Sequence, residues 1–335
     1  MRSIFTAFNL SRRVILLLCL PSIVGWPKND RKIPGQPGNF EVNSSARTSN
    51  TRPPYLLHFA PSLNPSKIPA MQPMLNIAIR AAHAAGDYIA RQVNNVPNLT
   101  IESKSTNDFV SQVDRQAEAR IIEVLLKAYP DHSILAEESG AQGDGDYQWI
   151  IDPLDGTTNF LHGFPHFAVS IALSVKGRLQ QAVIYDPIKQ ELFAASRGEG
   201  ATLNNRRIRV ARQTSSNGAL LGTGFPFRAK QHFPAYQAMF NDFFAAAADI
   251  RRAGSAALDL AYVASGRLDG FWEIGLKPWD MAAGALIIRE AGGLIGDFAG
   301  NEQYMQTGNI VGANPKLFAD MVRRLRPHLS DQLKA

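Results

Sequence analysis

The apolar positions of residues 73–93 recur every three or four residues, and this spacing predicts an amphipathic helix. The same spacing after Asp114 predicts a second helix, which Pro130 ends. One face of each helix therefore belongs to a core. The apolar positions are Leu75, Ala78, Ala82, Ala85 and Ile89 in the first helix, and Ala117, Ile121, Ile122, Leu125 and Leu126 in the second.

Short apolar runs replace the helical pattern after residue 132. SILAEE, QWIIDPLD, HFAVSIALSV, QAVIYDP and ELFAAS each have the length and composition of a buried strand. Asp186-Pro187 and Asn204-Asn205 separate neighbouring runs and are typical of hairpin turns. We therefore expect an antiparallel sheet in this part of the chain.

Helical and strand patterns alternate after about residue 215. The pattern predicts helices over 234–249, 255–265 and 280–291, with strands at GALLGTGFP, DGFWEIG, GLIGDF and NIVGAN. A last helix opens at Asn314, an N-cap that Pro315 follows, and runs to about Arg326. These elements indicate layers of helix and sheet. We expect an N-terminal α+β half over 71–214 and a C-terminal α/β half over 215–335.

Residues 1–70 differ from the rest in composition, with 9 of the 20 prolines and 9 Lys and Arg against 2 Asp and Glu. Their apolar stretch, residues 14–20, is too short to span a bilayer, although Arg12-Arg13 before it resembles a secretory signal. Three interpretations stay open: a disordered extension, a targeting peptide, or a start codon placed too early. The sharp change of pattern at Met71 favours a true start there.

The formal charge of +6 suggests a nucleic-acid or acidic-membrane partner only until it is divided along the chain. Residues 71–335 carry 26 basic against 27 acidic residues, so this part is close to neutral. We expect it to bind neither a membrane nor nucleic acid directly. Cys19 is the single cysteine, and residues 71–335 therefore hold no disulfide or thiolate metal site.

Carboxylates recur where apolar runs end. Glu137 follows SILA, Asp152 and Asp155 follow QWII, and Asp280 lies at the start of a predicted helix. An unpaired carboxylate in a buried strand costs several kcal/mol unless a partner offsets it. Oxygen ligands without His or Cys suit Mg²⁺ or Mn²⁺ better than zinc. The acids therefore predict a site for a hard cation.

Gly156-Thr157-Thr158 follows the acids directly and can open a helix whose free N–H groups bind phosphate. Metal-binding acids beside an anion cradle indicate phosphoryl transfer.

The stretches EES, WIIDPLDGTTNF and KPWDMAAGALIIREAGG together resemble the motifs of the inositol monophosphatase family, and most of all its bacterial inositol-1-monophosphatases. The likeness extends from about Met71 to the C-terminus. It implies the layered αβαβα sandwich shared with sugar bisphosphatases, an α+β fold that is usually a homodimer, and a cytoplasmic location. It also implies hydrolysis of myo-inositol monophosphate to inositol and phosphate by a metal-activated water. Two or three Mg²⁺ ions, which Mn²⁺ can replace, would be bound, and Li⁺ would inhibit.

The resemblance also implies roles for single residues, which are carried over by motif position. The first metal would be held by Glu137, Asp152 and the backbone carbonyl of Leu154, and the second by Asp152, Asp155 and Asp280. Glu137 would reach a third ion through water and counts with the catalytic residues. Thr157, with Asp114 behind it, would orient the attacking water. Phosphate would bind at Gly156, Thr157 and Thr158, and the polyol hydroxyls at Gly254, Ser255, Ala256 and Glu273.

Three other functions compete with this hypothesis. An aspartyl-phosphate phosphatase carries D-x-D near the chain start, whereas this chain has D-x-x-D in its middle. Fructose-bisphosphatase or nucleotide 3′-phosphatase activity stays open, although Glu273 would repel a second phosphate. Some bacterial relatives associate with ribosomal-RNA transcription, so RNA polymerase or an antitermination factor is an alternative partner. Lys104 lies near a basic position of the family, but the local spacing is one residue short.

Overall fold

The computed structural model describes residues 73–98, 101–105 and 108–334. The predictions for residues 1–70 and for Met71 therefore lie outside the described residues, and so does the side chain of Lys104. In the described part of the chain, no helix is both long enough and apolar enough to cross a membrane.

The two predicted N-terminal helices form as α1 (Pro73–Gln92) and α2 (Gln112–Ala128). The second helix begins earlier than expected, because Ser111 caps it and Asp114 lies in its first turn rather than before it. The Ser111 hydroxyl accepts the N–H of Val113 at 3.0 Å, while the Asp114 carboxylate accepts the N–H of Ser111 at 2.8 Å. This reciprocal cap fixes the start of α2.

The predicted antiparallel sheet is confirmed for most of its strands. Its order is β10-β9-β8-β7-β6-β5-β3-β4, and β3 pairs in parallel with β5 while the other neighbours are antiparallel. The hairpin at Asn204-Asn205 forms with positive φ at both residues. The strands are β3 (Ser133–Ala136), β4 (Gly140–Gln142), β5 (Tyr147–Asp155), β6 (Ala168–Val175), β7 (Arg178–Asp186), β8 (Glu191–Ser196), β9 (Gly200–Leu203) and β10 (Arg206–Arg207).

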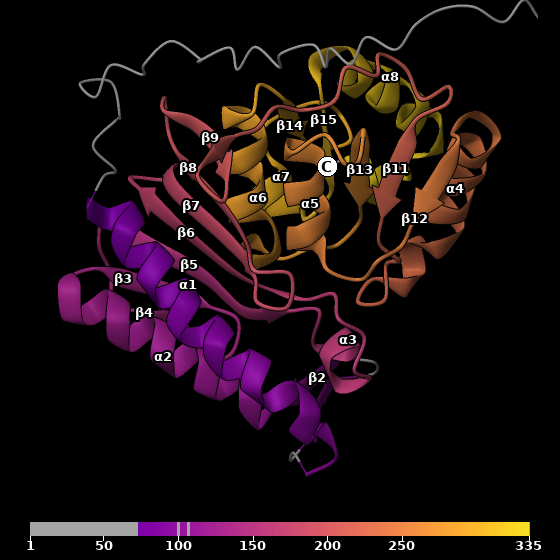
Figure 1. The fold of residues 1–335 in the computed structure, drawn as a ribbon. Helices are drawn as coiled ribbons and strands as arrows, with labels where there is room; N and C mark the ends of the chain where they lie inside the picture. The colour runs from indigo at the N-terminus through magenta and orange to yellow at the C-terminus, as the bar shows by residue number, and fades with distance from the viewer. Residues whose placement is uncertain (1–72, 99–100, 106–107, 335) are drawn as a thin grey trace, which may run out of the picture. The chain divides into compact units, whose positions relative to one another are not determined.

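Helices cover both faces of this sheet (Figure 1). Along β6, Val169 and Ile171 join the core beneath α1 and α2, while Ala168 and Ala172 join the core beneath α6 (Pro278–Glu290). Both sets alternate along the strand because successive side chains point to opposite faces. The strand is therefore apolar on both faces apart from the buried serines Ser170 and Ser174.

A second sheet, with the order β12-β11-β13-β15-β14, follows the first along the chain. The helices α5 (Ala256–Ala264) and α6 lie between the two sheets, and α4 (Phe233–Ala246) and α8 (Pro315–Leu325) cover the outer face of the second (Figure 1). The result is the layered αβαβα arrangement of an α+β fold. The strands are β11 (Leu220–Thr223), β12 (Asp249–Arg251), β13 (Gly270–Glu273), β14 (Leu294–Gly296) and β15 (Ile310–Ala313).

Local signals set the ends of several helices. The Asn314 side chain accepts the N–H groups of Lys316 and Leu317, so the predicted N-cap of α8 is confirmed. The predicted helices of this half differ from α4, α5 and α6 by at most three residues at either end. The shorter elements are β1 (Ile101–Ser105), β2 (Asp108–Ser111), α3 (Thr157–Leu161), α7 (Tyr304–Thr307), α9 (Asp331–Lys334) and the 3₁₀ turns Val93–Asn98, Lys230–His232 and Arg326–His328.

Candidate metal and phosphate site

A bulge at the end of β5 explains how two acids three residues apart can share one side of a strand. Asp152 lies opposite Ser170 of β6, but Asp155 lies opposite Ala168, so three steps along β5 match two along β6. Residues three apart in a regular strand face opposite ways, and the extra residue reverses the alternation. Leu154 accordingly packs in the α1–α2 core, leaving both aspartates on the other side.

Asp280 completes this group from the second half of the chain. It lies in the first turn of α6, where its carboxylate accepts the N–H of Lys277 at 2.7 Å. The Ser170 hydroxyl donates to the carbonyl of Trp279 at 3.2 Å and so ties β6 to the start of α6. Among the described residues, one carboxylate oxygen from each of Asp152, Asp155 and Asp280 lies within 4.8 Å of the others.

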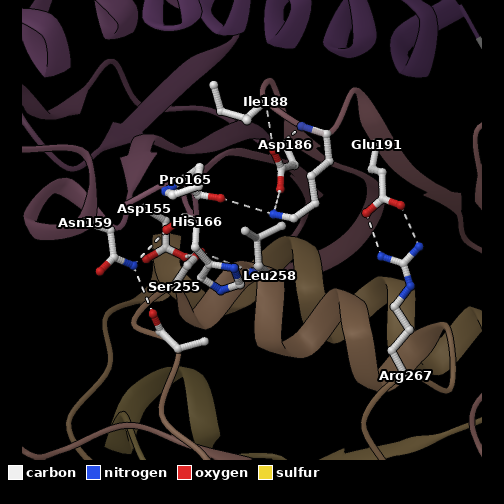
Figure 2. Close-up of polar contacts among 12 residues, drawn as sticks. Asp155, Asn159, Pro165, His166, Asp186, Ile188, Glu191, Ser255, Leu258 and Arg267 are labelled. Carbon is white, nitrogen blue, oxygen red and sulfur yellow. Dashed lines mark hydrogen bonds and ion pairs between the residues drawn. The ribbon is translucent and has the colours of Figure 1, made fainter. Parts of the chain in front are cut away.

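Asp155 also links the first sheet to α5. One of its oxygens accepts the Ser255 hydroxyl at 2.6 Å (Figure 2) and the N–H of Ala257 at 2.7 Å. The amide of Asn159 lies close by and donates to the carbonyls of His166 at 2.8 Å and Ala253 at 2.9 Å. These contacts leave the second oxygen of Asp155 for a cation and direct the hydroxyl proton of Ser255 to that aspartate.

Glu137 lies in the turn between β3 and β4 and lines the same cavity as the three aspartates. Its carboxylate is 3.7 Å from the guanidinium of Arg228, whose other nitrogen is 3.6 Å from Asp280. The turn is held from α2, where the buried carboxylate of Glu118 accepts the N–H groups of Glu138 at 2.8 Å and Ser139 at 2.9 Å. Glu118 therefore fixes the turn that carries Glu137.

The hydroxyl of Thr157 lies between two acceptors, the Asp114 carboxylate at 2.9 Å and the carbonyl of Leu154 at 3.1 Å. Asp114 is itself held by the N–H and hydroxyl of Ser111, at 2.8 and 2.6 Å. A hydroxyl has one proton to donate, and its lone pairs can accept another. The Thr157 hydroxyl can therefore accept a hydrogen bond from a water molecule while it donates its own hydrogen bond to Asp114.

Gly156 allows the chain to turn from β5 into α3. Its φ is +99°, and a Cβ there would lie 3.0 Å from the carbonyl oxygen of His166 and 3.2 Å from Phe167. Both the conformation and the close contacts exclude a larger residue. A helix begins at Thr157 as expected, and Gly156, Thr157 and Thr158 line the cavity beside the acids.

Burial raises the pKa of each clustered aspartate. The pKa of Asp155 rises to about 6, although hydrogen bonds from Ser255 and Ala257 oppose the shift. The pKa of Asp280 rises to about 7 for the same reason, and here Arg228 opposes it. The pKa of Asp152 lies well above its usual range, because burial and the neighbouring carboxylates both disfavour its charge. A cation among them would remove this penalty.

The cavity has a volume of about 460 Å³ and is lined by more acids than bases. Six carboxylates line it against two guanidiniums, so the lining has a formal charge of −4 when all are ionised. A phosphate cannot enter such a cavity without cations to neutralise the acids. The lining holds no His or Cys, and its converging oxygens fit Mg²⁺ or Mn²⁺.

Comparison with known proteins bears on what this site does. The family model described as "Inositol monophosphatase family" matches residues 70–330. The chain belongs to the inositol monophosphatase family. Nus factor SuhB of Pseudomonas aeruginosa is 54% identical over 270 residues, which cover 79% of this chain and 100% of that protein.

Solved structures of the family share the fold. The extragenic suppressor protein suhB of Bartonella henselae superposes with a TM-score of 0.74 at 44% identity, over 76% of this chain and 98% of that one. The inositol monophosphatase of Anabaena (Nostoc) sp. PCC 7120 gives a TM-score of 0.69 at 40% identity, over 77% and 96%. The family placement and the layered fold expected from the motifs are thereby confirmed.

Some residues of the site were not singled out from the sequence, among them Glu118, Asp259, Arg228 and Asn159. Glu118 follows Asp114 by one helical turn, so the spacing of two acids on one face of α2 could have revealed it. Asp259 is an acid inside an apolar helix, the same signal that drew attention to Asp152. For Arg228 and Asn159 we find no signal in the sequence, since folding alone brings them to the cavity.

Proposed function

We propose that this protein hydrolyses phosphate monoesters of polyols in the presence of Mg²⁺, with myo-inositol monophosphate as the substrate. The observation that carries the proposal is the acid cluster beside the start of α3, in a cavity whose lining has a formal charge of −4 when all its acids are ionised. Such a cavity suits an anion only together with divalent cations. The family supports phosphatase chemistry, and the choice of substrate is the proposal itself.

Mg²⁺ would be held by the carboxylates of Asp152, Asp155, Asp280 and Glu137 and by the carbonyl of Leu154. When bound, it neutralises charge on the phosphate and increases the acidity of water. Thr157 would accept a hydrogen from the attacking water and pass its own proton towards Asp114. The N–H groups at the start of α3 would orient the phosphate oxygens.

The first test is a panel of phosphate monoesters assayed with and without Mg²⁺. The panel contains myo-inositol 1-phosphate, fructose 1,6-bisphosphate and a nucleoside 3′-phosphate, so that the two rival phosphatases are tested together. Asp155→Asn should lower kcat by at least about 10²-fold and raise the Mg²⁺ concentration for half-activation. Asp144→Asn, at an exposed acid that does not line the cavity, is the control. Metal-independent turnover, or equal activity of the two variants, would refute the site.

The names of the relatives favour a second candidate function, which can coexist with the first. Proteins 54% identical to this chain are named Nus factor SuhB, in keeping with a regulator associated with ribosomal-RNA transcription. Purified RNA polymerase, with and without antitermination factors, should then bind wild-type protein and Asp155→Asn equally well. If RNA polymerase binds neither protein, the transcription-associated function is refuted.

The homodimer implied by the family motifs stays a prediction, which light scattering can test.

A further inference from the structure

Asp259 is a buried acid to which the proposed hydrolysis assigns no role. It lies in α5 among Leu258, Leu260 and Ala261, all with fully buried side chains, and only 2% of its own surface is exposed. It nevertheless lines the cavity that holds the acid cluster. Its Oδ1 has no hydrogen-bond partner among the described residues. Buried polar atoms are rarely left without partners, so we expect a ligand to supply the missing partner of this oxygen.

The capping of α5 does not explain Asp259. The first turn of the helix is satisfied by Ser255, whose hydroxyl accepts the N–H of Leu258 at 3.4 Å, and by Asp155, which accepts that of Ala257 at 2.7 Å. Asp259 also lies in the first turn, but its own N–H bonds to the carbonyl of Ser255 at 3.0 Å and no N–H of the turn bonds to its Oδ1. Burial raises the pKa of Asp259 well above its usual range, with a further contribution from Asp155.

The position of Asp259 relative to Glu273 indicates what the ligand is. Gly222 and Gly224 are two residues apart at the end of β11, so they face the same side of the chain. A Cβ on Gly222 would lie 3.7 Å from the carboxyl carbon of Asp259, and a Cβ on Gly224 would overlap the Glu273 carboxylate at 2.0 Å. The two carboxylates therefore lie over one face of this segment, along one wall of the cavity.

We propose that Asp259 is a specificity residue that accepts a hydrogen bond from a hydroxyl of the substrate, beside Glu273. Burial disfavours the charge of both carboxylates, and hydrogen bonds donated to a carboxylate stabilise its ionised form. Two such groups on one wall therefore match a ligand with neighbouring hydroxyl donors. A second phosphate offers no donor at neutral pH and would be repelled. This inference rests on the proposed phosphatase function and adds Asp259 to the residues that select a hydroxyl-bearing substrate.

The test compares Asp259→Asn with Asp269→Asn on two esters, myo-inositol 1-phosphate and phenyl phosphate, at saturating Mg²⁺. Asp269 is the matched control, because it accepts the N–H of Leu220 at 2.7 Å and does not line the cavity. Asp259→Asn should raise KM for inositol phosphate about ten- to hundredfold, the effect of losing a charged hydrogen bond. In Asp259→Asn, the ratio of kcat/KM for inositol phosphate to kcat/KM for phenyl phosphate should fall by the same factor. In Asp269→Asn, this ratio should stay at the wild-type value.

An unchanged ratio in Asp259→Asn, or an equal loss on both esters, would overturn the assignment. Wild-type protein that hydrolyses neither ester would instead refute the proposed function. In that event, calorimetric titration of wild type and Asp259→Asn with myo-inositol tests the subsite without turnover. Weaker binding to the variant supports the subsite, and equal binding or none to either protein overturns it. Thermal unfolding of both variants checks that they fold.

Discussion

The acid cluster should make the metal-free protein less stable as the pH rises. The folded-state pKa values of Asp155, about 6, and Asp280, about 7, both lie above the ordinary value of 3.8. Between the ordinary pKa of 3.8 and these higher folded-state pKa values, the folded protein binds more protons than the unfolded chain. The free energy of unfolding therefore falls as the pH increases through this range. The penalty is absent below about pH 4 and complete above about pH 7.

The size of the effect follows from the two shifts. At about 1.4 kcal/mol for each pKa unit, ionisation costs the fold about 3 kcal/mol at Asp155 and about 4 kcal/mol at Asp280. Part of each cost has already developed by pH 5. From pH 5 to pH 8, wild-type protein should therefore lose about 1 kcal/mol more than Asp155→Asn and about 3 kcal/mol more than Asp280→Asn.

Urea unfolding in EDTA over this pH range measures the difference, with exposed Asp144→Asn as the control. At pH 8 both site variants should be more stable than wild-type protein, because an amide removes a buried charge. Added Mg²⁺ should stabilise wild-type protein more at pH 8 than at pH 5 and should stabilise the variants little. If both site variants keep the pH dependence of the wild type, or if Mg²⁺ acts equally at both pH values, the reasoning is wrong.

Two further predictions concern the turn that carries Glu137 and the response to lithium. Glu118→Gln should cost about 1.5–3 kcal/mol in urea unfolding and raise the Mg²⁺ needed for half-activation, because the charged acceptor of two backbone N–H groups is lost. Exposed Glu123→Gln on the same helix is its control, and equal Mg²⁺ requirements in the two variants would contradict the role of Glu118. Li⁺ should inhibit wild-type phosphatase activity and inhibit Asp280→Asn less, as inhibition curves would show. A wild type insensitive to Li⁺ would count against an inositol phosphatase.

The sequence by itself determined most elements and the identity of the clustered acids. Asn314 before Pro315 predicted the start of α8, and Asn204-Asn205 predicted a hairpin, because caps and turns depend on a few adjacent residues. Asp152 and Asp155 stood out because acids are rare in apolar strands. The motifs around them were specific enough to identify the family, and with it the fold.

The tertiary structure alone decided which of these acids meet and which residues support them. Asp152 and Asp155 share a side only because β5 bulges against β6, and strand pairing is not encoded in three adjacent residues. Asp280 joins them across more than a hundred residues of chain, through the packing of α6 on the first sheet. Glu118 and Asp259 differ from other acids in their hydrogen-bond partners. Glu118 accepts two backbone N–H groups, whereas Oδ1 of Asp259 has no partner among the described residues. Spacing and apolar surroundings could mark both acids in the sequence, but their hydrogen-bond partners are set by folding and could not be read there.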